Sequence, residues 1–326
     1  MSRFVISLDF ELHWGVFDHT PLDEKSRGYF DRTRRLVIDL LEVFEARQVS
    51  VTWATVGMLF ARTKDELEAS LPAVRPHYHR TELDPYRLLE GVGENEEADP
   101  YHFAASLIEK VVATPGQCLG SHTFSHYYCL EAGQTAEAFA ADLQAAQLLA
   151  RRTTGGALTS LVFPRNQYTE RYLRVVKEQG FSSYRTNPSV WFWRAQAGAT
   201  TNSVRRLVRL VDHYLPLDAE SAYPPPSPQQ RPVNIPASRF LRPYLPKIDR
   251  YGGQRLKVRR ICQEMTTAAR EGKDYHLWWH PHNFATDPAR NLAALDRILS
   301  HFEHLRLTRG MQSCSMEECA AVDYAN

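Results

Sequence analysis

Short apolar stretches alternate with longer stretches of helical periodicity along most of the chain. Residues 3–9 form an apolar run typical of a buried strand, and residues 31–48 carry leucines at near-helical spacing. Residues 49–55 then alternate between apolar and polar positions, which predicts a second strand. This order of strand, helix and strand indicates an α/β fold with a mostly parallel sheet.

The same alternation continues to the end of the chain. Residues 135–152 are rich in alanine, with Thr135 as a capping residue at the start and Gly155 beyond the end, so they predict the clearest helix. The remaining predicted elements are helices at 56–62, 64–71, 169–179, 203–215, 254–271 and 288–302, a short helix opened by a Ser315 and Glu318 capping box, and strands at 118–122, 160–163, 181–185 and 275–280.

No change in composition is sharp enough to divide the chain. We therefore predict one catalytic domain over residues 1–326, with loop insertions at about 72–100 and 222–250, where proline is frequent and periodicity is weak. The expected architecture is a closed or nearly closed (β/α) barrel. In such barrels the active site lies at the carboxyl ends of the strands, so polar residues that end a strand are the first candidates for chemistry.

Composition narrows the range of partners. Lys and Arg number 39 and Asp and Glu 38, so no global field attracts nucleic acid or an anionic membrane. The five cysteines lack the spacing of a zinc motif or of a disulfide scaffold, which favours reduced thiols. No apolar run is long enough for a transmembrane helix, and residues 1–10 lack the apolar core of a signal peptide. We expect a cytoplasmic protein.

The first candidate motif is SLDFEL, which carries Asp9 and Glu11 at the end of the first predicted strand. Residues two apart on a strand point to the same face, so both carboxylates would lie at the same mouth of the barrel. Two acids so placed repel each other unless a cation lies between them. A solvated strand end is the alternative interpretation.

The second motif is GSHTFSHYYC, in which His122 and His126 follow a predicted strand. Two imidazoles four residues apart could chelate one metal ion. The spacing alone is weak evidence, because the chain has 13 histidines and a second pair, His276 and His280, at the same spacing.

Three further segments carry candidate groups. Arg165 in LVFPRNQY offers a guanidinium that could clamp a carboxylate, although a surface arginine is the alternative. His280 in YHLWWHPHNF ends a strand and could transfer a proton near neutral pH. Arg239 and Arg242 in NIPASRFLRPY could grip a sugar phosphate, or could belong to a solvated loop.

Taken in order, SLDFEL, GSHTFSH, FPRNQY and LWWHPHN resemble the motif series of the NodB-homology polysaccharide deacetylases, carbohydrate esterase family 4. The resemblance extends from Phe4 to about Asn283. It implies a distorted (β/α) barrel that binds one divalent metal ion, often zinc, and removes acetyl groups from N-acetylated amino sugars. The roles it implies are Asp9 as general base, Glu11, His122 and His126 as metal ligands, Arg165 as the residue that orients Asp9, and His280 as general acid.

This chain departs from the commonest family pattern, in which two aspartates are adjacent. Here Phe10 separates the acids and the second acid is glutamate, a spacing that resembles intracellular branches of the family without a signal peptide. The candidate substrate-binding residues are Trp14, Asn166, Trp278, His282, Asn283, Arg239 and Arg242.

The predicted function is that of a metal-dependent carbohydrate N-deacetylase acting on a polysaccharide or glycoconjugate precursor. Its expected partner is an N-acetylated sugar, a sugar nucleotide or a lipid-linked sugar, and not nucleic acid. The alternatives are a deformylase or an allantoinase-like cyclic amide hydrolase on the same barrel, and a barrel that binds carbohydrate without cutting it. The sequence does not distinguish among sugars, acyl groups, divalent metals or oligomeric states.

Overall fold

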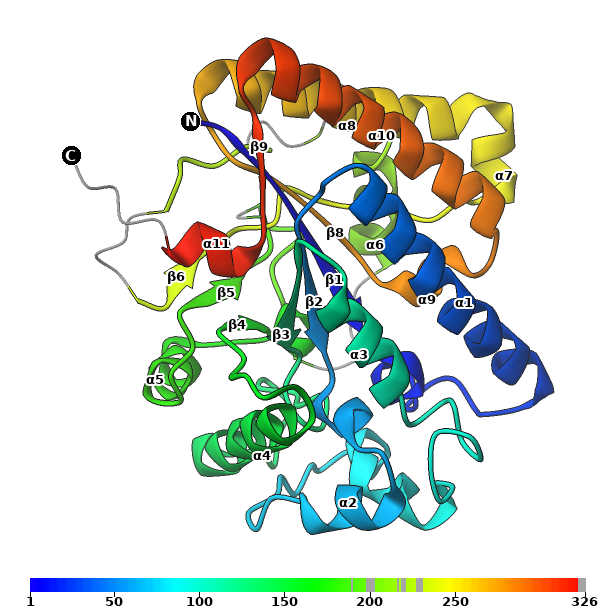
Figure 1. Ribbon diagram of the computed structural model, residues 1–326, viewed down its shortest axis with the longest axis vertical. Helices are drawn as coiled ribbons and strands as arrows, with labels where there is room; N and C mark the ends of the chain where they lie inside the picture. Colours follow the sequence, from blue (N-terminus) through cyan, green and yellow to red (C-terminus); the bar gives the residue numbers. More distant parts are fainter. Residues whose placement is uncertain (189, 198–202, 216, 218–220, 227–230, 322–326) are drawn as a thin grey trace.

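A parallel sheet forms the centre of the molecule (Figure 1). The computed structural model describes residues 1–188, 190–197, 203–215, 217, 221–226 and 231–321. The strands follow the order β6-β5-β4-β3-β2-β1-β8-β7, β9 pairs with β1, and every ladder is parallel. The strands are β1 (Arg3–Phe10), β2 (Val51–Thr55), β3 (Gln117–Ser121), β4 (Ser160–Val162), β5 (Ser183–Arg185), β6 (Val233–Asn234), β7 (Arg239–Phe240), β8 (Tyr275–Trp279) and β9 (Gln312–Cys314).

The edges of this sheet do not meet. Within the described residues, no ladder joins β6 to β7, so the sheet is a curled half-barrel rather than a closed barrel. The predicted α/β fold of the distorted barrel type is confirmed.

Helices surround the curled sheet, with α8 and α10 side by side along one flank and α4 beside α5 on another (Figure 1). The α-helices are α1 (Glu24–Ala46), α2 (Lys64–Ala69), α3 (Ala105–Ala113), α4 (Ala136–Thr154), α5 (Glu170–Glu178), α6 (Ser203–Asp212), α7 (Pro246–Ile248), α8 (Gln254–Glu271), α9 (Pro281–Phe284), α10 (Pro288–Arg309) and α11 (Met316–Ala321). Short 3-10 turns are η1 (Leu12–Gly15), η2 (Gly57–Phe60), η3 (Thr81–Leu83), η4 (Pro85–Gly91) and η5 (Pro164–Asn166), and a π turn, η6 (Asp249–Gly253), precedes α8.

The alternation of residues along β1 separates two apolar layers. Phe4, Ile6 and Leu8 belong to the large cluster beneath the helices, whereas Val5 belongs to a smaller inner cluster together with Met316 of α11. Side chains of a strand point alternately to its two faces, so β1 serves both layers. The next inward position after Val5 is polar, and the inner face of β1 becomes polar toward its carboxyl end.

Capping residues fix the helix ends that the sequence predicts best. The Thr135 hydroxyl accepts a hydrogen bond from the backbone N–H of Ala138 at 3.1 Å, and Gly155 ends α4 with φ of 77°. At α11, the backbone N–H of Ser315 donates to the Glu318 carboxylate at 2.6 Å, and the Ser315 hydroxyl accepts from the Glu318 N–H at 3.1 Å. The predicted capping box is confirmed.

Several boundaries differ from the prediction. α1 begins at Glu24 rather than residue 31, because the Asp23 carboxylate caps it by accepting from the Ser26 N–H at 2.8 Å. The segment predicted as a helix at 56–62 instead contains the 3-10 turn η2 over Gly57–Phe60, and α6 ends at Asp212 rather than residue 215. The sequence did not predict α3, α7, α9, β6, β7 or β9, and residues 227–230 of the predicted 222–250 insertion lie outside the described residues.

The structure describes all five cysteines. All five cysteines are free thiols, as predicted. Among the described residues, no helix combines the length and the apolar character needed to cross a lipid bilayer.

Candidate active site

Polar side chains from several strands meet at the carboxyl edge of the sheet. Because the ladders are parallel, the ends of β1, β3, β4, β5 and β8 lie at the same edge, where sites of such folds are found. A cavity of about 280 Å³ opens there. It is lined by Asp9, Glu11, Gly15, Val16, His19, His126, Arg165, Asn166, Trp278, His280, His282 and Asn283.

Glu11 lies between the two predicted metal-binding histidines. Its Oε1 is 3.0 Å from Nε2 of His122 and 3.2 Å from Nε2 of His126, and all three side chains are buried. The other ring nitrogens are held as well: His122 Nδ1 donates to the Val162 carbonyl at 2.8 Å, and His126 Nδ1 lies 3.0 Å from the Tyr128 hydroxyl. Both imidazoles therefore direct Nε2 toward the Glu11 carboxylate.

The loop after β3 is held in the conformation that brings the two imidazoles together. The Asp142 carboxylate of α4 accepts from the backbone N–H of Phe124 at 2.6 Å and from that of Ser125 at 3.1 Å. His126 has φ of 57°, in the left-handed region that is uncommon for residues other than glycine. A buried carboxylate from a neighbouring helix thus compensates for a strained turn at the site.

Asp9 is held by Arg185, which ends β5. Two parallel hydrogen bonds of 2.7 Å join the guanidinium to both carboxylate oxygens, and both side chains are buried. Burial by itself would raise the pKa of Asp9, but the Arg185 charge outweighs it, with help from His122, and lowers the pKa below its ordinary value. Asp9 is therefore a carboxylate at neutral pH.

A second layer of contacts fixes Arg185. Its guanidinium lies 4.1 Å from the centroid of the Trp278 ring and donates to the Ser7 hydroxyl at 2.9 Å. Ser7 in turn contacts Nε2 of His276 at 2.8 Å. Burial, together with the Arg185 charge, lowers the pKa of His276 to about 3, so this imidazole is neutral and part of the support.

His280 lies between the two carboxylates. Its Nε2 is 3.7 Å from Asp9 Oδ2 and 3.6 Å from Glu11 Oε1. The Asn283 side-chain amide donates to Nδ1 at 3.1 Å, which leaves the proton of a neutral imidazole on Nε2. His280 thus directs an N–H into the cavity.

The donor atoms suit a divalent cation. A carboxylate oxygen of Glu11 and nitrogens of His122 and His126 lie within 4.8 Å of one another, and a set of two histidines and one glutamate is typical of catalytic zinc. Burial would raise the pKa of Glu11, but the neighbouring imidazoles of His280, His122 and His126 hold that pKa well below its usual range. With Arg185 balancing Asp9, the Glu11 charge remains for a cation to neutralise.

A family model supports this interpretation. The model for polysaccharide deacetylases matches residues 17–184, slightly more than half of the chain. The chain belongs to the polysaccharide deacetylase family. The matched part of this family member includes His122, His126 and Arg165, and it ends one residue before Arg185.

Solved structures of similar fold include other members assigned to the polysaccharide deacetylases. A protein from Mycobacterium smegmatis is 12% identical, with a TM-score of 0.60 over 98% of this chain and 88% of that chain. One from Pseudomonas aeruginosa PAO1 is 14% identical, with a TM-score of 0.54 over 98% and 89%. The Puue allantoinase is 15% identical, with a TM-score of 0.53 over 98% and 88%. These likenesses show the fold, and no curated protein matches the chain.

Arg165 does not pair with Asp9, so that prediction is wrong. Arg165 forms an ion pair with Asp18 and lies 4.2 Å above the Tyr128 ring. Its backbone has φ of 54°, which turns the side chain to the rim of the cavity rather than to Asp9. Arg165 thus braces the tyrosine that contacts His126.

Three of the seven predicted substrate-binding residues lie outside the cavity lining. Trp14 is fully buried, and its indole N–H donates to the His102 carbonyl at 2.9 Å. Arg239 is buried in ion pairs with Asp212 and Glu264, and Arg242 is not among the residues that line the cavity beside Asp9 and Glu11. The predictions for Trp14 and Arg239 are corrected, because their polar groups are held by buried partners, whereas a substrate-binding role for Arg242 stays a prediction.

The other four predicted substrate-binding residues, Asn166, Trp278, His282 and Asn283, do line the cavity. Sequence reasoning missed Arg185, His19 and Gly15. Arg185 lies at the end of a predicted strand, and His280 was chosen as a candidate because it lies at the end of another. The same criterion could have found Arg185.

Gly15 makes room for Glu11. A Cβ atom added at this glycine would lie 2.0 Å from Glu11 Oε2 and 2.6 Å from Glu11 Cβ, so the carboxylate would have to move. We expect Gly15→Ala to weaken binding of a divalent ion by about 10–100-fold, as is common when the support of a ligand is lost. Titration with zinc against a competing chelator measures this. Gly156→Ala is the control, because nothing lies within 4 Å of its added Cβ, and equal affinities in both variants would contradict the prediction.

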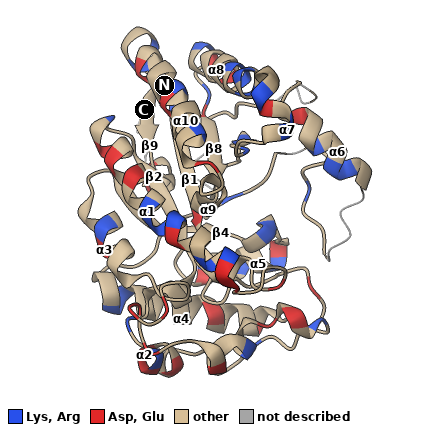
Figure 2. Ribbon diagram, turned by 90° about the vertical axis from the view of Figure 1, so that its right-hand side faces the viewer, with Lys and Arg blue, Asp and Glu red and all other residues tan. Residues whose placement is uncertain are grey.

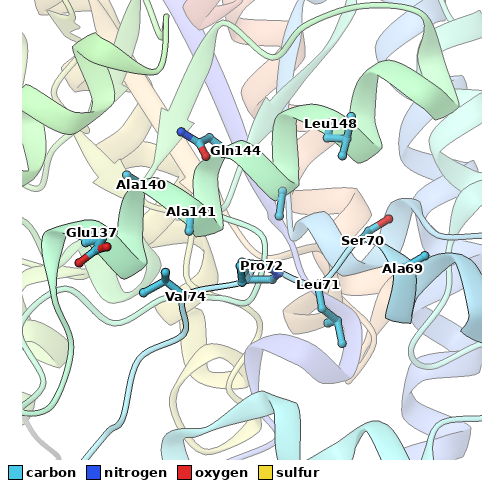
Figure 3. A pocket seen from close by; sticks show the side chains of 12 residues that line it. Ala69, Ser70, Leu71, Pro72, Val74, Glu137, Ala140, Ala141, Gln144 and Leu148 are labelled. Carbon is cyan, nitrogen blue, oxygen red and sulfur yellow. The ribbon is translucent and has the colours of Figure 1, made fainter.

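A second hollow lies between α4 and the segment after α2, and it carries no catalytic set (Figure 3). Its volume is about 450 Å³, and Glu137 is the only ionisable residue among those that line it. A single carboxylate, with no histidine, arginine or second acid among the lining residues, does not form the set of groups that hydrolysis requires. The carboxyl edge of the sheet is the better candidate.

Proposed function

We propose that this protein removes the acetyl group from an N-acetylated amino sugar, with one divalent metal ion, preferably zinc, as cofactor. The main support is the contrast between two buried carboxylates: Glu11 faces two imidazoles, whereas Asp9 faces a guanidinium. Such a contrast assigns different chemistry to two acids at one site. Membership of the polysaccharide deacetylase family supports the substrate class.

The charge state of each residue indicates its role in the proposed reaction. Glu11, His122 and His126 would hold the ion, which when bound would act as a Lewis acid on water and on the amide carbonyl. Asp9 is ionised and buried, so it can accept the proton of the attacking water as general base. Arg185 keeps the Asp9 carboxylate ionised and fixes its direction.

His280 would complete the reaction. An amide expels its nitrogen only when that nitrogen is protonated, and the Nε2–H of His280 points into the cavity between the carboxylates. Its side chain is 24% exposed, compared with 3% for both Asp9 and Glu11, so it is the most accessible of these three groups to a substrate.

The size of the cavity favours one sugar residue at the reacting centre. Its volume of about 280 Å³ is at the lower end for ligand sites. A neighbouring hollow of about 400 Å³ shares Asn166 with it and is also lined by Tyr168, Asn187 and Arg194. The rest of a larger precursor, such as a sugar nucleotide or a lipid-linked sugar, could extend there.

Removal and return of the metal test this proposal. We expect the purified protein to contain about one divalent ion per chain and to lose acetate release after dialysis against chelator, with recovery on addition of zinc. The His122→Ala/His126→Ala variant should hold no ion and show no recovery. Elemental analysis by mass spectrometry and an acetate assay on N-acetylated sugars provide the measurements.

The product separates this proposal from its alternatives. Formate as product would indicate a deformylase, and ring opening would indicate an allantoinase-like hydrolase. Full activity in the chelated protein would refute the metal-dependent mechanism. An ion bound without any hydrolysis would instead favour the barrel that binds carbohydrate without cutting it.

A further inference from the structure

The helices α6, α7 and α8 lie at the upper right of Figure 2. An exposed apolar surface lies where α6, α7 and the start of α8 meet. We call it the α6–α8 face and define it by the exposed side chains of Val204, Leu207, Leu215, Ile248, Tyr251 and Leu256. A hollow of about 550 Å³, lined mostly by apolar groups, runs between these elements. Leu207 is 60% exposed and Tyr251 74%, so these large side chains face solvent.

α6 has the reverse of the usual pattern for a helix on a globular protein. Its buried residues are Arg205 and Asp212, whereas its valines and leucines are exposed or only partly buried. None of its apolar residues belongs to a core cluster of the described part of the chain. A helix normally turns its apolar side to the core, so the outward leucines need a partner outside the fold.

Positive charge surrounds the apolar side chains. Five basic residues of these segments are exposed, and none forms an ion pair with an acid of the described chain. The two acids of these segments point inward: Asp249 pairs with Lys257 at 2.6 Å, and Asp212 with Arg239 at 3.1 Å. The exposed cations are Arg206, Lys247, Arg250, Arg255 and Arg259.

We infer that the α6–α8 face docks on the surface of an anionic phospholipid bilayer. Apolar side chains ringed by lysine and arginine fit such a surface, since the former enter the boundary of the acyl chains and the latter contact the phosphates. A second copy fits poorly, because a two-fold contact would oppose the same five cations. Nucleic acid would contact the cations but leave Leu207 and Leu256 in water.

The docking face adjoins the wall of the candidate active site. His213 follows α6 directly, and its ring lies 5.9 Å from that of Phe240, which lies 4.8 Å from the Trp278 ring. Trp278 lines the catalytic cavity. Docking would hold this side of the barrel at the membrane, whatever amide the site hydrolyses.

Sedimentation with lipid vesicles tests the inference without any assay of activity. We expect the intact protein to bind phosphatidylcholine vesicles that contain phosphatidylglycerol at least about tenfold more tightly than vesicles of phosphatidylcholine alone, and less tightly as salt is raised. The variants Leu207→Ser/Tyr251→Ser and Arg255→Gln/Arg259→Gln should each lose about tenfold in affinity for the anionic vesicles.

A matched pair on the last turn of α10, Leu307→Ser/Arg309→Gln, is the control. Leu307 is 85% exposed, and this pair should bind vesicles like the unaltered protein. Circular dichroism melts check that each variant is folded. Equal binding to neutral and anionic vesicles, or equal losses in the face and control variants, would refute the inference. So would a dimer on light scattering that only the face variants dissociate, since the face would then belong to a second copy.

Discussion

We expect Asp9→Asn to lower the rate of acetate release by about 10²–10⁴-fold, with little change in KM. Asparagine has nearly the same size as aspartate but cannot accept a proton from water at neutral pH. The effect should appear mainly in kcat, because Asp9 acts on the attacking water rather than on the sugar. Steady-state kinetics on the best N-acetylated substrate give both constants.

Asp18→Asn is the matched control for this substitution. Asp18 also pairs with an arginine near the cavity, but its partner is Arg165 at the rim. We expect its loss to change kcat by less than about tenfold, since it lies outside the set that would transfer protons. Metal content should stay near one ion per chain in both variants. If Asp9→Asn retained a tenth or more of the rate, Asp9 would not be the general base.

The second large effect is expected from Arg185→Gln. The substitution leaves Asp9 buried without its cation, which we expect to destabilise the fold by about 3–5 kcal/mol. It should also raise the pKa of Asp9, because the guanidinium is the largest influence that lowers it. The base then becomes active only at higher pH, so the acid limb of the kcat/KM profile should move upward. Urea unfolding and a pH–rate profile measure the two effects.

The sign of the pH dependence of stability follows from the same pair. The pKa of Asp9 is lower in the folded protein than in the unfolded chain, so the pair stabilises the fold above the unfolded value near 4. This stabilisation is lost as pH falls through the lower, folded value. In Arg185→Gln the difference from the unmodified protein should therefore be largest near neutral pH and shrink in acid.

The substitution Arg165→Gln tests whether Arg165, like Arg185, influences Asp9. The Arg165 side chain is 31% exposed, so its ion pair with Asp18 should contribute about 1 kcal/mol or less. We expect its acid limb to stay where it is in the unaltered protein. If the acid limb moved in Arg165→Gln and stayed in place in Arg185→Gln, Arg165 rather than Arg185 would control the pKa of Asp9.

Local chemistry made much of the fold predictable. Thr135 and Gly155 mark the ends of α4 because a side-chain cap and a left-handed residue act on the adjacent turn alone. The Ser315 and Glu318 capping box is local in the same way. Predictions of this type need no knowledge of what packs against the helix.

Partners across the barrel could not be predicted. Arg185 reaches Asp9 because β4 and β5 pair with Val162 opposite Arg185, which brings the guanidinium to the layer of β1 where Asp9 lies. That register depends on the whole sheet, whereas Arg165 was selected because it lies within the FPRNQY motif. β7 and β9 have two and three residues and form only because longer strands lie beside them.

Trp14 illustrates a different limit. An aromatic residue near an acid pair is a reasonable platform for a sugar, but this indole is buried against His102, which contacts His13 at 2.8 Å and Asp99 at 2.7 Å. These contacts join η1 to a segment about ninety residues further along. Composition near a motif does not reveal whether an amphipathic side chain faces a cavity or a buried neighbour.

The position of β1 has a consequence for the growing chain. Its neighbour β2 is synthesised soon after it, but β8 and β9 come more than 260 residues later, and Arg185 comes 176 residues after Asp9. Until then the apolar strand has an unpaired edge, which favours association with other chains. Two uncompensated carboxylates, Asp9 and Glu11, stand at its end during that time, and charges that flank an apolar strand oppose aggregation. Before the site has formed, Asp9 and Glu11 would thus reduce aggregation of β1 in the nascent chain.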